Sequence, residues 1–254
     1  MVVLDAHGVE QNDLSFQKAL ASFGEVAVYS RTKPEDTVQR IGDAEAIFVN
    51  KVVIDRKVFE SCPRLKFVGI NATGFNVVDI IEAKARGIIV CNVPSYSTDS
   101  VAQLTFALLL ELCSAVGAHN TAVHNGDWVN SEDFCFSVSK VSELNGKTFG
   151  IIGYGNIGRT VKKIAEAFGM KVLAYNRTPK EDTVSLDEIL KKSDVVSLHC
   201  ALSNDNAKMI NAQTLALMHP SAFLLNTARG GLIDEQALAD ALNSGRIAGA
   251  AVDV

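Results

Sequence analysis

Three glycines in the middle of the chain have the spacing of a turn that binds the pyrophosphate of a dinucleotide. Gly153, Gly155 and Gly158 form the pattern G-x-G-x-x-G directly after the apolar run 148–152. The first glycine of such a turn permits the tight bend, the second lets the backbone approach the pyrophosphate, and the third allows a helix to pack closely on a strand. The amides and dipole at the start of that helix would face the phosphates. Because the spacing alone is not specific, its place between a strand and a helix must support the interpretation.

Two further stretches have the chemistry to bind a carboxylate. Arg229 follows a predicted strand, so its guanidinium could hold a carboxylate through two hydrogen bonds and polarise an adjacent carbonyl. The alternative is a structural or phosphate-binding arginine. Ala72, Thr73 and Gly74 follow another predicted strand, and the backbone amides of such a small-residue turn suit a carboxylate.

The residues after the strand 171–175 bear on the type of cofactor. An acidic residue about twenty positions after the glycine pattern usually holds the adenosine ribose of NAD. Here Asn176, Arg177 and Thr178 stand at that place, with Lys180 near. Because these side chains could hydrogen-bond a 2′-phosphate that a carboxylate would repel, they favour NADP over NAD. The alternative is that Arg177 is a solvated turn residue and that NAD is accepted through Asn176.

Hydride transfer to a ketone needs a proton donor, most often a histidine. His199 is the one histidine of five at the carboxyl end of a strand in the glycine-rich half of the chain. It is therefore the nominee from the residues alone, although a packed residue beside the cofactor is the favoured alternative. The sequence predicts no metal site. The other histidines are His7, His119, His124 and His219.

The elements that must position these residues form two alternating series. Continuous apolar strands that alternate with helices indicate parallel sheets covered on both faces. The sequence therefore predicts an α/β fold with two doubly wound parallel-sheet domains, residues 1–96 and residues 97–254, and the glycine pattern opens the second series. Strands are predicted at 2–4, 25–29, 46–50, 66–70, 87–91, 148–152, 171–175, 194–198, 222–226 and 248–253, and helices at 13–22, 34–41, 55–61, 77–85, 99–118, 157–168, 185–192, 211–218 and 235–244.

Composition limits the partners and the compartment. Of the 254 residues 48% are hydrophobic and 21% are charged, and the net charge is −5, which favours neither nucleic acid nor an anionic membrane as a partner. Five cysteines without a C-x-x-C pair, and the lack of a signal-peptide pattern at the start, predict a cytoplasmic protein. The apolar helix at 99–118 is interpreted as a link between the domains that packs against a second subunit in a homodimer. The alternative is an ordinary core helix.

The chain resembles the D-isomer-specific 2-hydroxyacid dehydrogenases, most closely the glycerate dehydrogenase and hydroxypyruvate reductase group. The resemblance implies a flavodoxin-like substrate domain, a Rossmann NAD(P)-binding domain, and the reversible reduction of a small 2-oxo acid, such as hydroxypyruvate or glyoxylate, by nicotinamide hydride. The matching stretches lie in family order at 72–79, 93–103, 153–158, 226–234 and 251–254.

The same resemblance implies roles for single residues. Arg229 matches the catalytic arginine that binds the substrate carboxylate and carbonyl. Thr73 matches a cofactor contact beside the turn at Ala72 and Gly74 that receives the substrate carboxylate. His199 does not match the family's catalytic histidine. The remaining implied cofactor contacts are Asn156 and Ile157 at the pyrophosphate, Asn176 at the ribose, and Cys200, Thr227, Ala228 and Asp253 along the adenosine or nicotinamide.

The sequence departs from the family pattern in several places. The family's acid-base histidine and the glutamate that orients it come after the position of Asp253, as does a segment that returns to the first domain. Asn176 replaces the aspartate of NAD-specific members, and Ala201 stands at a common proline position. We therefore expect a C-terminally truncated chain that cannot turn over at a useful rate. The alternative is a corepressor-like protein that senses nicotinamide dinucleotides without turnover.

Overall fold

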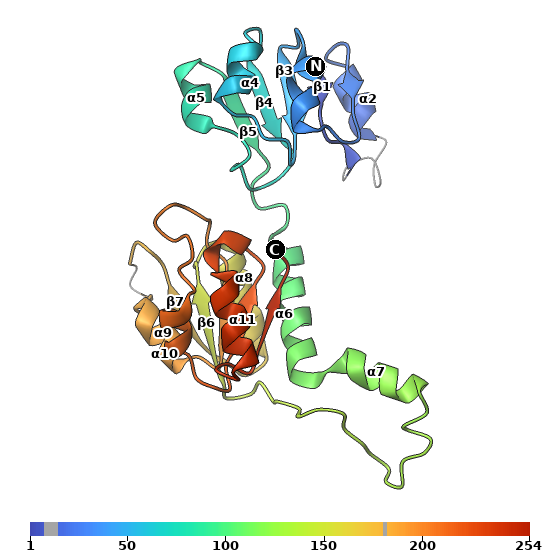
Figure 1. Cartoon of the computed structure of the whole chain (residues 1–254), viewed down its shortest axis with the longest axis vertical. Helices are drawn as coiled ribbons and strands as arrows, with labels where there is room; N and C mark the ends of the chain where they lie inside the picture. Colours follow the sequence, from blue (N-terminus) through green and yellow to red (C-terminus); the bar gives the residue numbers. More distant parts are fainter. Residues whose placement is uncertain (8–14, 180–181) are drawn as a thin grey trace. The chain divides into compact units, whose positions relative to one another are not determined.

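The chain forms two compact units, Met1–Tyr96 and Ser97–Val254, each built on its own sheet. The structure, a computed structural model, describes residues 1–7, 15–179 and 182–254 (Figure 1). All pairings between the strands it describes are parallel. The prediction of an α/β fold with two doubly wound parallel sheets is confirmed.

The strands of the first unit form a flavodoxin-like sheet. They are β1 (Val2–Val3), β2 (Ala27–Val28), β3 (Ala46–Val49), β4 (Phe67–Ile70) and β5 (Ile89–Asn92). Their order is β2-β1-β3-β4-β5, which is the flavodoxin-like order. Ile47 and Val68 on one face and Val3 on the other are fully buried, so both faces of the sheet are covered.

Short helices connect these strands, and two of them begin at aspartate caps. The helices are α2 (Ser15–Ala21), the 3-10 turn η1 (Pro34–Asp36), α3 (Thr37–Ile41), α4 (Arg56–Ser61) and α5 (Ile80–Ala85). The carboxylate of Asp55 accepts a hydrogen bond from the Val58 amide, and that of Asp79 accepts one from the Glu82 amide. The cap explains why α5 begins at Ile80 and not at residue 77. Residues 13 and 14 of the predicted helix at 13–22 lie outside the described residues.

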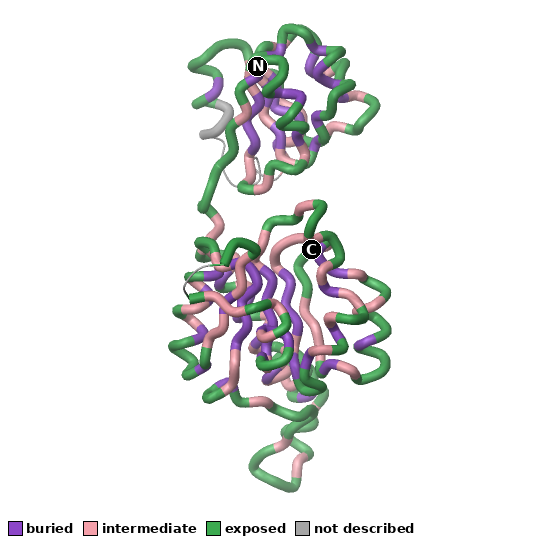
Figure 2. Tube along the Cα trace, turned by 90° about the vertical axis from the view of Figure 1, so that its left-hand side faces the viewer, coloured by how far each residue is buried: buried purple, intermediate pink, exposed green. Residues whose placement is uncertain are grey.

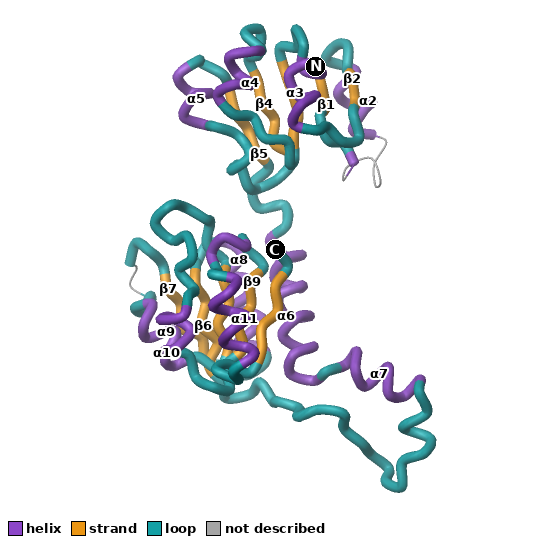
Figure 3. The backbone as a smooth tube through the Cα atoms, in the orientation of Figure 1, coloured by secondary structure: helices purple, strands orange, loops and turns teal. Residues whose placement is uncertain are grey.

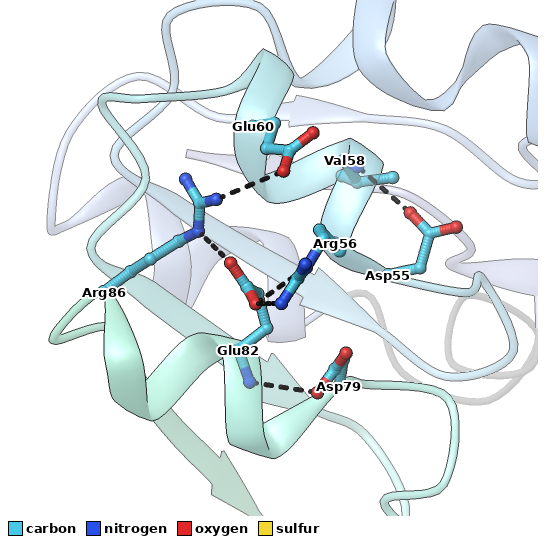
Figure 4. Close-up of polar contacts among 7 residues, drawn as sticks. All are labelled: Asp55, Arg56, Val58, Glu60, Asp79, Glu82 and Arg86. Carbon is cyan, nitrogen blue, oxygen red and sulfur yellow. Dashed lines mark hydrogen bonds and ion pairs between the residues drawn. The ribbon is translucent and has the colours of Figure 1, made fainter.

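A clamped carboxylate joins α4 to α5 (Figure 4). Glu82 is only 9% exposed, and it accepts hydrogen bonds from Arg86 Nε at 2.7 Å and Arg56 Nε at 3.0 Å. Glu60 lies 3.7 Å from the Arg86 guanidinium. The two arginines, Arg86 foremost, hold the pKa of Glu82 below its usual range. The cluster therefore stabilises the first unit while the Glu82 carboxyl is ionised.

The second unit has the strand order of a dinucleotide-binding sheet. Its strands are β6 (Thr148–Ile152), β7 (Lys171–Tyr175), β8 (Val195–Leu198), β9 (Phe223–Asn226) and β10 (Gly249–Val252). Their order, β10-β9-β8-β6-β7, is the 6-5-4-1-2 part of the Rossmann sheet. The order reverses between β6 and β8, so the ligand crevice is expected at the carboxyl ends of these two strands.

Helices pack on both faces of this sheet and bury its strands (Figure 2). The Phe106 ring stacks on Phe149 of β6, with ring centroids 5.8 Å apart, and on Phe168 at 5.5 Å. The fully buried Ile151 lies in the same apolar cluster. The helices are α6 (Thr98–Ser114), α7 (Val116–His124), α8 (Asn156–Ala167), α9 (Leu186–Lys192), α10 (Ala212–Leu217) and α11 (Glu235–Asn243), with the 3-10 turn η2 (Gly230–Leu232).

The single helix predicted at 99–118 is wrong. Ala115 has the left-handed conformation, with φ 46° and ψ 47°, and it ends α6 and starts α7. The Glu111 carboxylate accepts a hydrogen bond from the Gly117 amide, which stabilises the break. Figure 3 shows α7 and the segment after it extending away from the sheet of the second unit. In the part of the chain that the structure describes, no single helix is long and apolar enough to span a membrane; α6 and α7, bent by 58°, pass only as a pair and only by length and composition.

Candidate active site

The glycine pattern forms a tight turn between β6 and α8. Gly153 has φ 103°, and a Cβ there would lie 2.5 Å from the Cys200 amide nitrogen, so only glycine fits. The Gly153 amide donates to the Tyr175 carbonyl at 2.9 Å, which ties the turn to the end of β7. A Cβ on Gly158 would lie 2.5 Å from the Gly153 carbonyl oxygen. These two glycines therefore let α8 start directly against the end of the sheet.

Gly155 has a different environment, because space opens beside it. A Cβ at this position would meet no atom within 4 Å, and its backbone is extended. Gly155 is also the N-cap residue of α8, and it contributes no side-chain cap to the first turn. An uncapped helix N-terminus with room in front of it is a ready site for phosphate oxygens. The turn therefore fits the pyrophosphate of a dinucleotide, and Asn156 and Ile157 supply the next two amides.

Asn176 connects the glycine turn to the end of β7. Its side-chain oxygen accepts a hydrogen bond from the Tyr154 amide at 2.8 Å. The next residue, Arg177, forms an ion pair with Asp205, with 3.1 Å between Nη1 and Oδ2. Thr178 is exposed, and Lys180 lies outside the described residues. A neutral amide and an arginine thus lie at the place where an NAD-specific sheet has a carboxylate.

A cavity of about 490 Å³ opens at the carboxyl ends of β6, β7 and β8. Its walls bring together the glycine turn, the end of β7 and the loop after β8, at the point where the strand order reverses. The position agrees with the rule for ligand sites in open parallel sheets. The residues that matter most here are Gly153, Gly155, Asn176, Arg177, His199, Cys200 and Asp205.

His199 is an uncharged wall of this cavity. Its Nε2 lies 2.9 Å from the Ser197 hydroxyl, and its buried Nδ1 has no hydrogen-bond partner among the described residues. Burial lowers the pKa of His199 to about 4, so the ring is neutral at physiological pH. Burial also raises the pKa of the neighbouring Cys200 thiol, which stays protonated. The geometry therefore favours the interpretation of His199 as a packed residue over that of a proton donor.

Arg229 is held at the end of β9 by a buried asparagine. Asn226 is fully buried; its Nδ2 donates to the Arg229 carbonyl at 2.9 Å, and its Oδ1 accepts from the Ala228 amide at 3.0 Å. The Thr227 hydroxyl lies 3.2 Å from that of Thr105 on α6. The Arg229 guanidinium donates to the Ala228 carbonyl at 2.7 Å and pairs with no carboxylate in the described ranges. Its charge is therefore available to an anionic ligand.

β10 pairs with β9 on the side away from β8. The Asp253 amide, directly after β10, donates to the Asn226 carbonyl at 3.0 Å. Asp253 therefore lies beside the end of β9, from which the turn with Arg229 continues.

The first-unit residues predicted to bind a carboxylate lie in a turn after a strand. Ala72, Thr73 and Gly74 follow β4, and the turn is tied to the end of β5 on both sides. The Thr73 hydroxyl donates to the Val93 carbonyl at 3.0 Å, and Asn92 Nδ2 donates to the Thr73 carbonyl at 2.8 Å. These bonds use the side chain and the carbonyl of Thr73, so they leave the donor side of the turn unaffected.

Comparison with known proteins assigns the family. Residues 106–254 match the family model described as D-isomer specific 2-hydroxyacid dehydrogenase, NAD binding domain. The whole chain is 47% identical to the hydroxypyruvate reductase of Blautia hydrogenotrophica and covers 82% of it. The chain belongs to the D-isomer specific 2-hydroxyacid dehydrogenase family. A second relative is the glycerate dehydrogenase of Methylorubrum extorquens, which is 43% identical over 87% of the chain and is covered to 70%.

Solved structures of similar fold contain nicotinamide dinucleotides. An acyclic imino acid reductase in complex with NADPH and D-arginine matches the whole chain with a TM-score of 0.90 at 31% identity, and 82% of that protein is covered. A D-lactate dehydrogenase from Aquifex aeolicus, complexed with NAD and lactic acid, matches with a TM-score of 0.89 at 33% identity and 77% coverage. The cofactor class of this 2-hydroxyacid dehydrogenase family member is therefore a nicotinamide dinucleotide. The two neighbours do not decide between NAD and NADP.

Several residues that border a cavity in one unit or the other were not predicted from the sequence. Asp205 and Asn206 line the cavity from the loop after β8, and a signal existed, because any loop after a strand next to the reversal point borders the crevice. In the first unit, the Asp5 carboxylate accepts hydrogen bonds from the amides of Asn50, Lys51 and Val52 beside a cavity of about 800 Å³. The sequence carried no signal for that arrangement, because it joins residues 45 positions or more apart.

Proposed function

We propose that this protein is an NAD(P)-dependent reductase of a small 2-oxo acid, with NADP preferred. The single observation that carries the proposal is Arg229, a partly buried guanidinium without a carboxylate partner, at the edge of the sheet whose glycine turn fits a pyrophosphate. Relatives named hydroxypyruvate reductase, glycerate dehydrogenase and glyoxylate reductase support hydroxypyruvate or glyoxylate as the substrate, reduced to D-glycerate or glycolate.

Each part of the site has a separate task in this proposal. The nicotinamide dinucleotide supplies the hydride when it is bound. The turn with Gly153, Gly155 and Gly158 holds the pyrophosphate on the amides of Asn156 and Ile157. Further contacts to the cofactor come from Asn176, Arg177, Thr178, Cys200, Thr227, Ala228 and Asp253.

The substrate is held through its carboxylate. Arg229 binds the carboxylate and polarises the adjacent carbonyl, which favours the negative charge that develops on the carbonyl oxygen. In the first unit, the turn of Ala72, Thr73 and Gly74 offers backbone amides that suit a carboxylate. Residues 1–96 act in this scheme as the substrate domain and residues 97–254 as the NAD(P)-binding domain.

The supply of a proton limits what residues 1–254 do on their own. His199 has a pKa of about 4, so it is not an imidazolium and cannot serve as a general acid at physiological pH. His119, His124 and His219 are bonded to the Ala115 carbonyl, the Asn120 carbonyl and the Ser221 hydroxyl, and neither they nor His7 line the cavity beside His199. We therefore propose that residues 1–254 bind the cofactor but reduce 2-oxo acids about 100-fold or more below the 1 to 1,000 turnovers per second that are typical of enzymes, because general acid catalysis contributes about 100- to 10,000-fold.

A steady-state assay of residues 1–254 with hydroxypyruvate and NADPH tests this statement. Turnover in the ordinary range would contradict it. The assay, combined with binding of hydroxypyruvate, also separates the reductase from a nicotinamide-sensing protein. A sensor needs no carboxylate site, so saturable binding of hydroxypyruvate that depends on Arg229 supports the reductase, and its absence supports the sensor.

We also propose a cytoplasmic homodimer. The five cysteines are all free, as expected in a reducing compartment. The exposed apolar side chains that support a dimer lie at the end of the helix predicted at 99–118 and in the segment after it. Phe134 is 92% exposed, Val129 84% and Val116 60%, and Trp128 lies near them in sequence. Monomeric proteins rarely expose so many large apolar side chains in one segment.

Sedimentation should give a dimer for the unsubstituted chain and a monomer for Val129→Asp/Phe134→Ser, and an unchanged dimer would refute this interface.

A further inference from the structure

The Asp205 carboxylate lies at the rim of the dinucleotide cavity and pairs with Arg177, the arginine that favours NADP. Asp205 Oδ2 is 3.1 Å from Arg177 Nη1. Arg177 follows β7 and Asp205 lies in the loop after β8, and both line the cavity. The two side chains are 73% and 76% exposed, so water screens their attraction and the pair is easily exchanged for another partner.

The loop that carries Asp205 is held by its neighbour and not by the ion pair. Asn206 Oδ1 accepts a hydrogen bond from the Ser203 amide at 2.7 Å, and Asn206 Nδ2 donates to the Ala201 carbonyl at 2.8 Å. The loop is thereby closed on itself. Asp205 has no other hydrogen bond or ion pair within the described residues. The carboxylate therefore stays at the rim when Arg177 turns to another anion.

We infer that Asp205 is a specificity-determining residue, which lowers the preference of this site for NADP over NAD. The inference rests on the proposed function as a nicotinamide dinucleotide enzyme. A 2′-phosphate would be attracted by Arg177, but Asp205 repels it and competes for the same guanidinium. NAD carries a hydroxyl in place of that phosphate and experiences neither effect. Asn176 does not discriminate, because its oxygen is used by the Tyr154 amide and its amino group suits a hydroxyl or a phosphate oxygen.

The size of the effect follows from the charges. Two charges about 6 Å apart in water-like surroundings, one of them divalent, change a binding constant by about tenfold. Neutralising Asp205 should therefore tighten NADPH binding about tenfold at low salt and change NADH binding by about twofold at most. High salt should reduce the gain, because both groups are exposed.

The experiment measures the dissociation constants of NADPH and NADH by nucleotide fluorescence, on residues 1–254. The variants are Asp205→Asn, Asp205→Ala, and Asp205→Asn/Arg177→Gln. The matched control is Glu166→Gln, which also removes one negative charge and one exposed ion pair, with Lys162, on the same unit but does not line the cavity. We expect both Asp205 variants to shift the NADPH to NADH affinity ratio about tenfold towards NADPH, the double variant to lose that shift, and the control to leave the ratio unchanged.

The possible failures are distinguishable. If the unsubstituted chain binds neither nucleotide, the proposed function fails and the inference with it. If it binds both and the two Asp205 variants leave the ratio unchanged, or the Glu166→Gln control shifts it equally, the role of Asp205 is refuted while the proposed function stands. Circular dichroism of each variant shows that it is folded, and two different replacements at residue 205 guard against an effect of one side chain.

Discussion

Replacement of Gly155 by alanine should separate dinucleotide binding from folding. The backbone of Gly155 has φ −89° and ψ −155°, which alanine adopts without strain, and a Cβ there would meet no atom within 4 Å. The free energy of unfolding should therefore stay within about 0.5 kcal/mol of the unsubstituted chain, or rise by up to about 1 kcal/mol because alanine restricts the unfolded state.

The affinity for NADPH, in contrast to the stability, should fall. The new methyl group lies in the open space in front of the first turn of α8, where we place the pyrophosphate. A hydrogen bond to a charged group contributes about 1.5 to 3 kcal/mol, so the loss of one raises the dissociation constant of NADPH by about 10- to 100-fold. The expected signature is thus a folded protein of unchanged stability that has lost most of its affinity.

Urea unfolding followed by circular dichroism gives the stability, and fluorescence of bound NADPH gives the affinity. Gly158→Ala is the contrasting variant, because its Cβ would overlap the Gly153 carbonyl oxygen at 2.5 Å. A folded Gly155→Ala protein that binds NADPH as tightly as the unsubstituted chain would refute the assignment of this space to the pyrophosphate. Loss of folding in Gly155→Ala would refute the reading of its surroundings as open.

Three other substitutions test the packing and the charges described above. Gly158→Ala should lower the free energy of unfolding by about 1 to 3 kcal/mol, because the start of α8 must shift; an unfolding midpoint equal to that of the unsubstituted chain would contradict it. Glu82→Gln should destabilise the first unit at neutral pH, and the difference from the unsubstituted chain should vanish as the pH falls through the lowered pKa of Glu82, since the clamp stabilises only the ionised carboxyl; a difference independent of pH would exclude this cause. His199 has a pKa of about 4 in the folded chain and 6.5 as its ordinary value. Between pH 6.5 and pH 4 the imidazole therefore gains a proton in the unfolded chain only, and the free energy of unfolding should fall by up to about 3 kcal/mol over this range. His199→Gln should lack this part of the slope in urea titrations, and parallel slopes would show that the ring is not kept neutral.

The sequence predicted those parts of the site that depend on local pattern. The strand-turn-helix unit around Gly153 and Gly158 could be predicted because part of what it requires is local: Gly153 has φ 103°, and a Cβ on Gly158 would overlap the Gly153 carbonyl oxygen of the same turn. The contact of Gly153 with the Cys200 amide comes from a distant loop and was not predicted. The apolar runs of the strands were equally readable, because a parallel sheet buried on both faces needs a continuous run of apolar residues.

The features that the sequence did not reveal depend on side-chain contacts that an apolar pattern does not record. The break falls on Ala115, which is neither glycine nor proline, and the Glu111 carboxylate stabilises it by accepting a hydrogen bond from the Gly117 amide. The pairing of Arg177 with Asp205 joins two loops 28 positions apart, which only the strand order brings together. The preference for NADP was predicted from the positive charge of Arg177 alone, whereas the structure pairs that charge with the Asp205 carboxylate.

The most direct test of the central claim is the binding of hydroxypyruvate to the chain saturated with oxidised cofactor, measured by calorimetry for the unsubstituted chain and for Arg229→Lys. Lysine keeps the charge but loses the two-pronged geometry, and Arg229 has no other described side-chain bond than that to the Ala228 carbonyl, so folding should be unaffected. Arg64→Lys, at an exposed position of the first unit, serves as the matched control. We expect saturable binding that Arg229→Lys weakens about tenfold or more and that Arg64→Lys leaves unchanged. Equal binding by all three proteins would contradict it.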